Sequence, residues 1–449
     1  MSEPGATTAE RRRDPGDWSL LSEGVCAHFR TGSFAVGAEL AKAVVTLVPA
    51  DAVRVAIDVR RRGVTVRLPA DGAGEGDGRL EAGTAARISA VARRLHAPSD
   101  SSALQSVEVA IDASDVPAVL PMWQAALGYE ANGDSLVDPR GRNATFVFRP
   151  GHEPDGRRHR VHIDLATPYD LADARRAAAL AAGGRVVTAA RPWVIADAEG
   201  NETCAGGANP DLVPRAPGER EGWDGDLAEA ADEPAEVGWR EFHETAGVAD
   251  WRMLDMGATA FFRAGSLAAG ARLVREVSVL PGLGDRRPEL DLRPDGVTVR
   301  LITLTPTFGG PASRQDVVLA REISTIARAL GLVADPTGVQ SLLVAIDALD
   351  IPAVKGFWGA ALGYEPRPDT DQDLLDPLGH CPVVWFQQMD EPRGQRNRIR
   401  LEVTVPAQHA AARVLGAVAA GGHVVGDEGP DRTLIADVEG NELCLAAAR

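Results

Sequence analysis

The chain has 449 residues, of which 45% are hydrophobic, and a formal net charge of −17. Its length predicts several domains, each with a substantial core. The acidic balance argues against binding to nucleic acid or anionic lipid. The first 17 residues contain no apolar stretch of the kind a signal peptide has, and no segment approaches the roughly 18 apolar residues of a membrane helix, so we expect a cytoplasmic globular protein.

The two halves of the chain repeat one another. FRTGS at 29–33 returns as FRAGS at 262–266, and VAIDASDVPAVLPMWQAALGYE at 109–130 returns as VAIDALDIPAVKGFWGAALGYE at 344–365. Each half holds two different segments, A and B, so the sequence predicts a tandem duplication. The predicted organisation is a disordered tail at 1–16, unit A1 at 17–98, unit B1 at 104–208, a linker rich in Pro, Gly and charge at 209–249, unit A2 at 250–335 and unit B2 at 339–449.

Unit A is predicted to contain a helix, two strands and a second helix. Apolar residues recur at helical spacing in 35–47 and 313–332, and GVTVRL at 63–68 and 296–301 alternates as a half-buried strand does. The segment RRPELDLRPDGVTVRLITL at 286–304, with the helix after it, resembles pterin-4a-carbinolamine dehydratase. That resemblance implies acid–base dehydration of a pterin by three histidines.

Unit A departs from that family at the histidines. Other residues stand at the three positions: Arg286, Arg287 and Leu304 in A2, and Val53, Arg54 and Asp71 in A1. Arginine does not shuttle protons at neutral pH. The family's acidic position is kept as Asp316, but together with Ser313 it also matches a helix capping box. We therefore expect unit A to be a scaffold or an association surface that has lost dehydratase chemistry.

Unit B is predicted to contain two βαβββ cycles. In B1 the first cycle has a strand at 106–112, a helix at 116–128 and strands near 135–139 and 144–150, and the second opens with a strand at 160–166 and a helix at 170–184. With MW or FW before AALGYE and a terminal DxEGNExC, the pattern resembles the glyoxalase-like, vicinal-oxygen-chelate superfamily. The predicted fold class is α+β, with two such units alternating with the two dehydratase-like units. The resemblance implies sheets that curl around one cavity per unit, in metal-dependent lyases and isomerases or in metal-free binding proteins.

The metal enzymes of that superfamily take ligands from three strands. The resemblance places these positions on Glu108, His162 and Cys204 in B1, a set that would favour zinc. In B2 they fall on Leu343, Arg400 and Cys444, which cannot hold a metal as a set. We therefore expect no cofactor, and keep a divalent metal in B1 as the alternative. Because the cysteine occurs in both copies, we favour a packing role for it.

Eight further side chains are candidates for lining a ligand cavity: Trp123, Phe146, Phe148, Asp164, Trp358, Trp385, Arg400 and Glu402. The helix tryptophans fit a core position or a pocket wall. His162 fits a hydrogen-bonded core histidine or a ligand, with Asp164 on the same strand face. For Arg400 and Glu402 we favour an internal ion pair over an anchor for an anionic ligand.

Three functions remain open. The leading hypothesis is a metal-independent protein that binds an aromatic or polycyclic small molecule, for sequestration, resistance or an accessory biosynthetic role. The second is a lyase or isomerase active only in B1, with Glu108 and His162 as catalytic groups. The third is a structural or regulatory protein that forms homo-oligomers through its A units. Neither nucleic acid nor a membrane is an expected partner.

Overall fold

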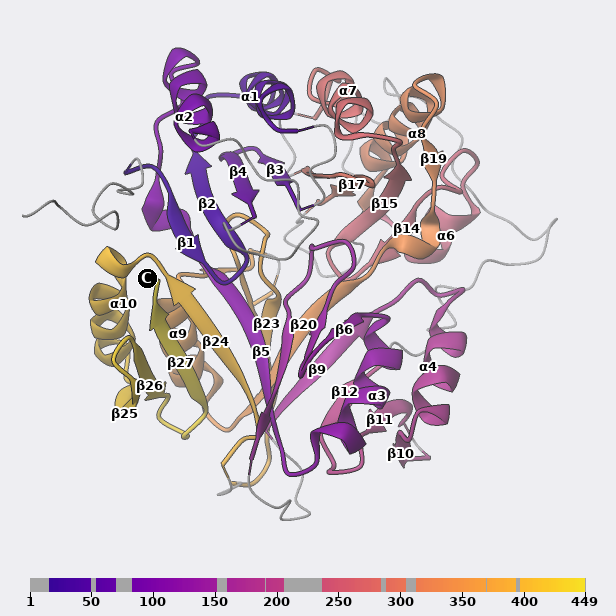
Figure 1. The fold of residues 1–449 in the computed structure, drawn as a ribbon. Coiled ribbons are helices and arrows are strands. Elements are labelled where there is room, and N and C mark those ends of the chain that lie inside the picture. Colours follow the sequence, from indigo (N-terminus) through magenta and orange to yellow (C-terminus); the bar gives the residue numbers. More distant parts are fainter. Residues whose placement is uncertain are drawn as a thin grey trace, which may run out of the picture.

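The computed structural model describes residues 16–49, 54–69, 83–151, 160–189, 191–205, 236–283, 288–303, 312–368, 370–392 and 396–448. Nearly all of the predicted tail and most of the linker lie outside these ranges, as do Val53, Asp71, Arg286, Arg287 and Leu304. The A units form one layer and the B units the other (Figure 1). Within the described residues, no helix is both long and apolar enough to cross a membrane.

Each A unit consists of a β-hairpin and a helix followed by a second hairpin and a second helix. In A1 these are β1 (Ser19–Leu21), β2 (Gly24–Phe29), α1 (Phe34–Leu47), β3 (Ala56–Arg60), β4 (Gly63–Leu68) and α2 (Thr84–Arg94). In A2 they are β14 (Arg252–Leu254), β15 (Gly257–Arg263), α7 (Leu267–Val277), β16 (Glu289–Arg293), β17 (Gly296–Leu301) and α8 (Arg314–Ala329), with β19 (Val333–Ala334) added to β15. The opening hairpins were not predicted, because β2 and β15 are buried along nearly their whole length and show no alternation.

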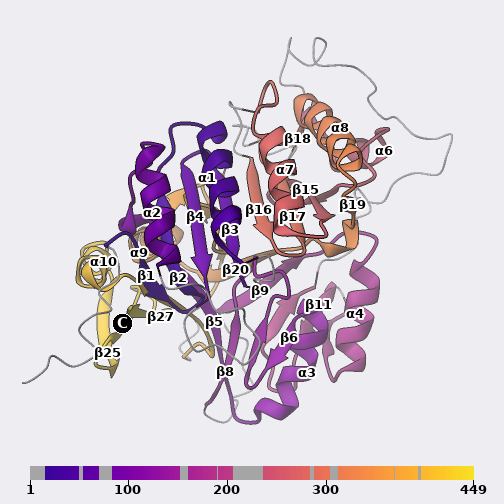
Figure 2. The same ribbon diagram turned by 45° about the horizontal axis from the view of Figure 1, so that its top comes forward.

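The two A units share one sheet of nine strands. Its order is β1-β2-β4-β3-β16-β17-β15-β14, with β19 beside β15, so A1 meets A2 where β3 pairs antiparallel with β16. Helices α1, α2, α7 and α8 lie on one side of this sheet, and the B units lie on the other (Figures 1 and 2). The A units therefore associate with each other inside one chain.

Buried charge holds this junction together. Asp58 of β3 stands opposite Asp291 of β16, and each is 1% exposed. Asp58 pairs with Arg293 of the other unit at 2.6 Å, and Asp291 pairs with Arg60 at 2.5 Å. Because each carboxylate takes a guanidinium from across the junction, the pairing satisfies both buried charges.

The end of the predicted linker belongs to A2. Residues Glu236–Val237 form β13, which pairs with β18 (Ala312–Ser313), and Trp239–Glu244 form α6. Phe242 of α6 is fully buried in the core shared by the A units. The segment from 236 onward is thus part of the folded unit.

The B units contain the predicted βαβββ cycles. In B1 the elements are β5 (Ser106–Ala113), α3 (Val116–Leu127), β6 (Glu130–Asn132), β7 (Ser135–Val137), β8 (Phe146–Pro150), β9 (Val161–Ala166), α4 (Ala172–Ala181), β10 (Arg185–Thr188), β11 (Arg191–Ala196) and β12 (Glu202–Cys204). In B2 they are β20 (Ser341–Ala348), α9 (Ile351–Leu362), β21 (Glu365–Pro366), β22 (Asp373–Leu375), β23 (Val383–Gln388), β24 (Ile399–Val405), α10 (Ala407–Ala419), β25 (His423–Gly429), β26 (Arg432–Ala436) and β27 (Glu442–Ala447).

The B cycles pair across the two halves of the chain. One eight-stranded sheet has the order β25-β26-β27-β24-β5-β8-β7-β6, and the other has the order β10-β11-β12-β9-β20-β23-β22-β21. At the centre of the first sheet β5 of B1 pairs with β24 of B2, and at the centre of the second β9 of B1 pairs with β20 of B2. The expectation that the two cycles of one B unit curl around a shared cavity is corrected accordingly, because each sheet takes one cycle from each half.

Each of these sheets has one apolar face and one polar face. Alternate residues of the central strands, such as Val107, Val109, Leu401 and Val403, lie in the hydrophobic core with the B helices. The residues between them point the other way. We call the opposite faces polar face 1, on the sheet with β5 and β24, and polar face 2, on the sheet with β9 and β20.

Candidate functional site

The repeated turn DxEGN clamps the first helix of its own B unit. Asp197 is fully buried and accepts hydrogen bonds from the Trp123 indole at 2.9 Å, from the backbone N–H groups of Glu199 and Asn201 at 2.9 Å each, and from the Asn201 amide at 2.8 Å. Gly200 has φ +88°, which glycine adopts without strain. In B2, Asp437 accepts the same set of hydrogen bonds from Trp358, Glu439 and Asn441.

The glutamate of this turn fixes the start of the same helix. Glu199 accepts hydrogen bonds from the Ser114 hydroxyl and from the Asp115 backbone, both at 2.8 Å, and pairs with Arg398 at 2.9 Å. Burial alone would raise the pKa of Glu199, but these hydrogen bonds and the guanidinium outweigh it and hold the pKa below its ordinary value. The motif that opens both C-terminal strands is therefore structural.

Four of the aromatic candidates belong to the core. Trp123, Trp358 and Phe146 are no more than 1% exposed, and Phe148 is 2% exposed, all within the cluster that the B helices cover. Trp385 differs from them in its position on the strand. It lies opposite Ala345, and the residue at the equivalent place in the other sheet, opposite Ala110, is Val147. Since neighbouring strand residues face opposite ways, Trp385 lies on polar face 2 while Phe146 and Phe148 point into the core.

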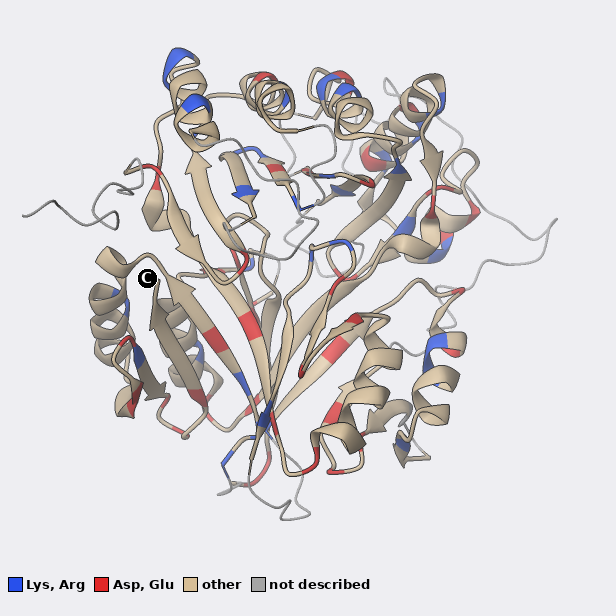
Figure 3. Cartoon of the chain, viewed as in Figure 1, with Lys and Arg blue, Asp and Glu red and all other residues tan. Residues whose placement is uncertain are grey.

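Polar face 1 carries a network of charges, and acidic positions of β5 and β24 lie side by side in Figure 3. Glu402, 2% exposed, accepts a hydrogen bond from Arg432 at 2.8 Å and pairs with Arg149. Arg400 lies 3.6 Å from the other Glu402 oxygen and 3.3 Å from Glu428. The internal ion pair favoured for Arg400 and Glu402 is confirmed.

The donors on polar face 1 do not fit a divalent metal. The strand register sets Glu108, Glu402 and Cys444 in a row, since Glu402 lies opposite both of the others. Three guanidinium groups surround Glu402. Burial raises the pKa of Cys444 to about 12, and burial with the Glu402 charge raises the pKa of Glu108. A site already balanced by arginines gives little attraction for a cation.

Polar face 2 holds a smaller cluster around Asp164. The Trp385 indole donates to one carboxylate oxygen at 2.8 Å, and His162 Nε2 lies 3.5 Å from the other. Burial raises the pKa of Asp164. His162 Nδ1 is buried and has no hydrogen-bond partner among the described residues. Asp164 lies opposite Leu343 on one side and Cys204 on the other, so this row contains a leucine that cannot coordinate.

The structure does not bring Glu108 together with His162 and Cys204. Glu108 lies on β5 opposite Glu402, whereas His162 lies on β9 opposite Ala345 in the other sheet. The grouping of Glu108, His162 and Cys204 into one site is corrected, because the sheets combine cycles from different halves. Across the described residues, no three His, Cys, Asp or Glu side chains are placed to hold a metal ion together.

The hairpin tips of the A units reach the polar faces. In A1, the Ser22 hydroxyl donates to the Ser106 hydroxyl of β5 at 2.8 Å. In A2, Met256 is packed with Ile302, Leu375 and Val383 in a small buried cluster that includes residues of β22 and β23. Each A unit therefore covers part of the B sheet below it.

A cavity of about 350 Å³ lies at the junction of A2 and B2, and Arg60, Arg61 and Arg62 of A1 also line it. Its apolar lining includes Met256 and Ile302 from A2 and Leu375 and Val383 from B2. Val383 is two residues before Trp385 on the same strand face.

The polar groups at this cavity come mainly from the A sheet. Arg300 is one of them, and it pairs with Glu289 at 3.2 Å. Burial and the neighbouring Arg142 lower the pKa of Arg300 to about 10, which leaves it charged at neutral pH. A cavity with one apolar wall and a few polar groups is typical of small-molecule sites.

Sequence analysis missed these cavity residues, although one repeat pointed to them. LVDPRGRN at 136–143 and LLDPLGHC at 374–381 are counterparts. In each, the aspartate accepts hydrogen bonds from backbone N–H groups of its own loop, as Asp376 does from Leu378, His380 and Cys381. These Asp-Pro-x-Gly loops join the A sheet to the B sheets, since Arg60 donates to the Leu378 carbonyl at 2.8 Å.

In unit A, the described candidate is Asp316. It forms the predicted capping box with Ser313 at the start of α8, and it is fully buried. Of the six positions at which the dehydratase family has histidine, Arg54 is described, and the five residues already named lie outside the described ranges.

Two segments of the chain, residues 108–206 and 343–446, match the family model for a glyoxalase-like domain, and neither match extends into an A unit. Glyoxalase I from Zea mays is 11% identical, with 76% of this chain and 93% of that chain covered and a TM-score of 0.31. A glyoxalase-related enzyme from Fulvimarina pelagi is 18% identical, with 23% and 85% covered and a TM-score of 0.19. The hypothetical protein SA1046 from S. aureus is 13% identical, with 23% and 90% covered and a TM-score of 0.20. No curated protein matches the sequence. The chain therefore carries two segments similar to the glyoxalase-like domain, one in each half.

Proposed function

We propose that the protein binds an aromatic or otherwise largely apolar small molecule in the cavity between A2 and B2, without a metal ion. The observation that supports this most directly is the cavity of about 350 Å³ beside polar face 2, with an apolar wall shared by the two units. That volume lies in the range of small-molecule sites. Arg300 and Glu289 are among the charged side chains that line it, together with Arg60, Arg61 and Arg62 of A1.

The metal-independent part of the proposal follows from the donor sets. On polar face 1 the carboxylate of Glu402 is already paired with arginines. On polar face 2 the residue beside Asp164 and Cys204 is Leu343, which has no atom that could bind a metal. Neither set has the open arrangement of oxygen, nitrogen or thiolate donors that zinc or iron needs.

The duplication provides a matched test of the ligand site. Met256 stands where A1 has Glu23, so Met256→Glu makes the second copy resemble the first and places a charge against the apolar wall. We expect this variant to lose binding of neutral planar aromatic compounds, measured by quenching of tryptophan fluorescence with Trp385 as the nearby reporter.

The reciprocal variant Glu23→Met is the control, since Glu23 lies 41% exposed in the other unit, and it should leave binding unchanged. If both variants bind such compounds as the parent protein does, the ligand is not held in this cavity. If the parent protein binds none of a broad aromatic panel, the proposed function is wrong.

A further inference from the structure

A second cavity, of about 420 Å³, lies between A1 and B2 and shares Arg62, Asp376, Pro377 and Leu378 with the first. Its counterpart in the duplicated half is a cavity of only about 40 Å³ between A2 and B1. Most of the residues that line one cavity have an equivalent, at the same place in the other half of the duplication, that lines the other cavity. Such pairs are Leu362 and Leu127, Asp376 and Asp138, Arg413 and Arg175, and Gln105 and Gln340. We call them the open pocket and the closed pocket.

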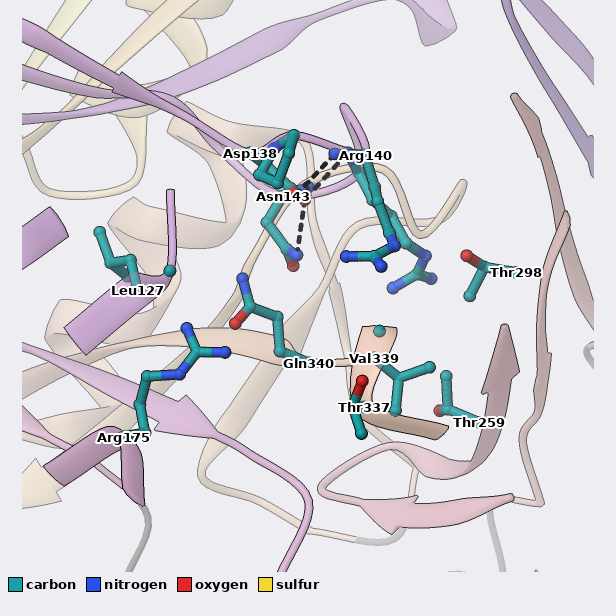
Figure 4. A pocket seen from close by; sticks show the side chains of 14 residues that line it. Leu127, Asp138, Arg140, Asn143, Arg175, Thr259, Thr298, Thr337, Val339 and Gln340 are labelled. Atoms are coloured by element: carbon teal, nitrogen blue, oxygen red, sulfur yellow. Dashed lines mark hydrogen bonds between the residues drawn. The ribbon is translucent and has the colours of Figure 1, made fainter. Parts of the chain in front are cut away.

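Arg140 closes the closed pocket. Its guanidinium lies 4.6 Å from the centre of the Phe261 ring and 3.5 Å from Asp335. A Cβ added at Gly338 would lie 2.6 Å from this guanidinium, so the glycine leaves room for it. Figure 4 shows Arg140, Arg175 and Gln340 around the remaining space.

The open pocket differs at all three of these positions. Leu378 replaces Arg140, Ala103 replaces Gly338, and His28 replaces Phe261. Leucine is shorter than arginine and uncharged, so the volume that Arg140 takes in one copy is free in the other. These three positions lie in three different segments of the chain and differ together between the two copies. The difference indicates that the pocket is filled by a side chain in one copy and left open in the other.

Among the described residues that line the open pocket, one guanidinium has no carboxylate within ion-pair distance. Asp100 pairs with Arg30, and Arg62 pairs with Glu365. Arg413 donates to the Gln105 amide oxygen at 3.1 Å and to the Ala361 carbonyl at 3.3 Å, and among the described residues no carboxylate lies within 4.0 Å of it. Burial lowers the pKa of Arg413, and a bound anion would reduce that cost.

We propose that the open pocket is a second ligand site that binds a small organic oxyanion, a carboxylate or a phosphate ester, through Arg413. Leu362, Leu378 and Ala103 provide an apolar side for the body of the ligand, and Ser102 and Thr31 add hydroxyl groups to the lining. In the closed copy, Arg140 fills the corresponding volume. This site adjoins the cavity of the proposed function, and Leu378 lines both, but Arg413 lines the open pocket and not the other cavity.

Calorimetric titration of the full-length protein with benzoate, phenyl phosphate and neutral benzamide tests the proposal. We expect an anion to bind and benzamide to bind at least about tenfold more weakly, because the charge-assisted contact is lost. Arg413→Gln should weaken anion binding by about tenfold or more, and Leu378→Arg, which copies the closed pocket, should abolish it. Arg175→Gln is the matched control and should change nothing. The stronger of the two anions identifies the oxyanion class.

Met256→Glu separates this proposal from the function proposed above. It should leave anion binding intact, because Met256 lines only the other cavity of the two. The second site is refuted if neither anion binds, if benzamide binds as tightly as benzoate, or if correctly folded Arg413→Gln and Leu378→Arg variants bind anions as the parent does. The same conclusion follows if Met256→Glu abolishes anion binding while Arg413→Gln does not.

Discussion

Replacement of Asp197 by alanine should destabilise unit B1 strongly. The carboxylate is fully buried and accepts four hydrogen bonds, from Trp123, from Glu199 and two from Asn201. A hydrogen bond to a charged acceptor contributes about 1.5–3 kcal/mol, and the donors left behind would be buried without partners. Because such contributions are not additive, we expect a loss of about 3–5 kcal/mol, as for removal of one partner from a buried network.

Asp197→Asn sharpens this prediction. The side chain keeps its shape, but its NH₂ group meets existing donors in either orientation of the amide. In one orientation it faces the Trp123 indole and the Asn201 amide, and in the other it faces the backbone N–H groups of Glu199 and Asn201. We therefore expect asparagine to cost about 2–3 kcal/mol in spite of its size. Ala198→Ser, at the exposed residue of the same turn, should cost less than about 0.5 kcal/mol.

Urea unfolding followed by tryptophan fluorescence measures these changes, and native-state hydrogen exchange locates them. Protection should fall in α3 and β12 before it falls in the A units, since Asp197 connects those two elements of B1. A loss below about 1 kcal/mol for Asp197→Ala, or no loss for Asp197→Asn, would show that the turn does not clamp the helix.

Two further changes probe the A units. Burial lowers the pKa of His28 to about 4, so the histidine is neutral in the folded protein at neutral pH. As the pH falls from about 6.5 toward 4, the histidine is protonated in the unfolded chain but not in the folded chain. The free energy of unfolding should therefore fall by up to about 1.4 kcal/mol per pH unit from this group. His28→Phe, the residue of the other copy, should flatten this pH dependence in urea titrations, and an unchanged slope would contradict it. Asp58→Asn should cost about 3–5 kcal/mol, because Arg67 and Arg293 would lose their shared buried partner. Cross-linking or small-angle scattering should then show the A units separating, and a compact variant of parental stability would refute this account of their junction.

The local features were predictable because each depends on residues close together in the chain. The capping box of Ser313 and Asp316 and the turn at Asp197–Asn201 follow from spacing alone. The duplicated segments and the order of units are equally visible in the sequence, because a repeat needs no knowledge of the fold.

The pairing of the sheets was not predictable in the same way. The strands β9 and β24 open equivalent cycles, and each could pair with β5 or with β20 by its alternation of apolar residues. In the structure each pairs with the first strand of the other half's B unit, and the A units also join across the halves, through β3 and β16. Site residues were misgrouped for that reason, since Glu108 and His162 lie in one B unit but in different sheets.

Metal content measured together with ligand binding tests the central claim most directly. Protein purified without a chelator should contain far less than one zinc or iron ion per chain by mass spectrometry, and its affinity for a cavity ligand should be the same before and after treatment with a chelator. One equivalent of metal per chain, whose removal abolishes binding and whose return restores it, would contradict a ligand site that depends only on the protein's own side chains.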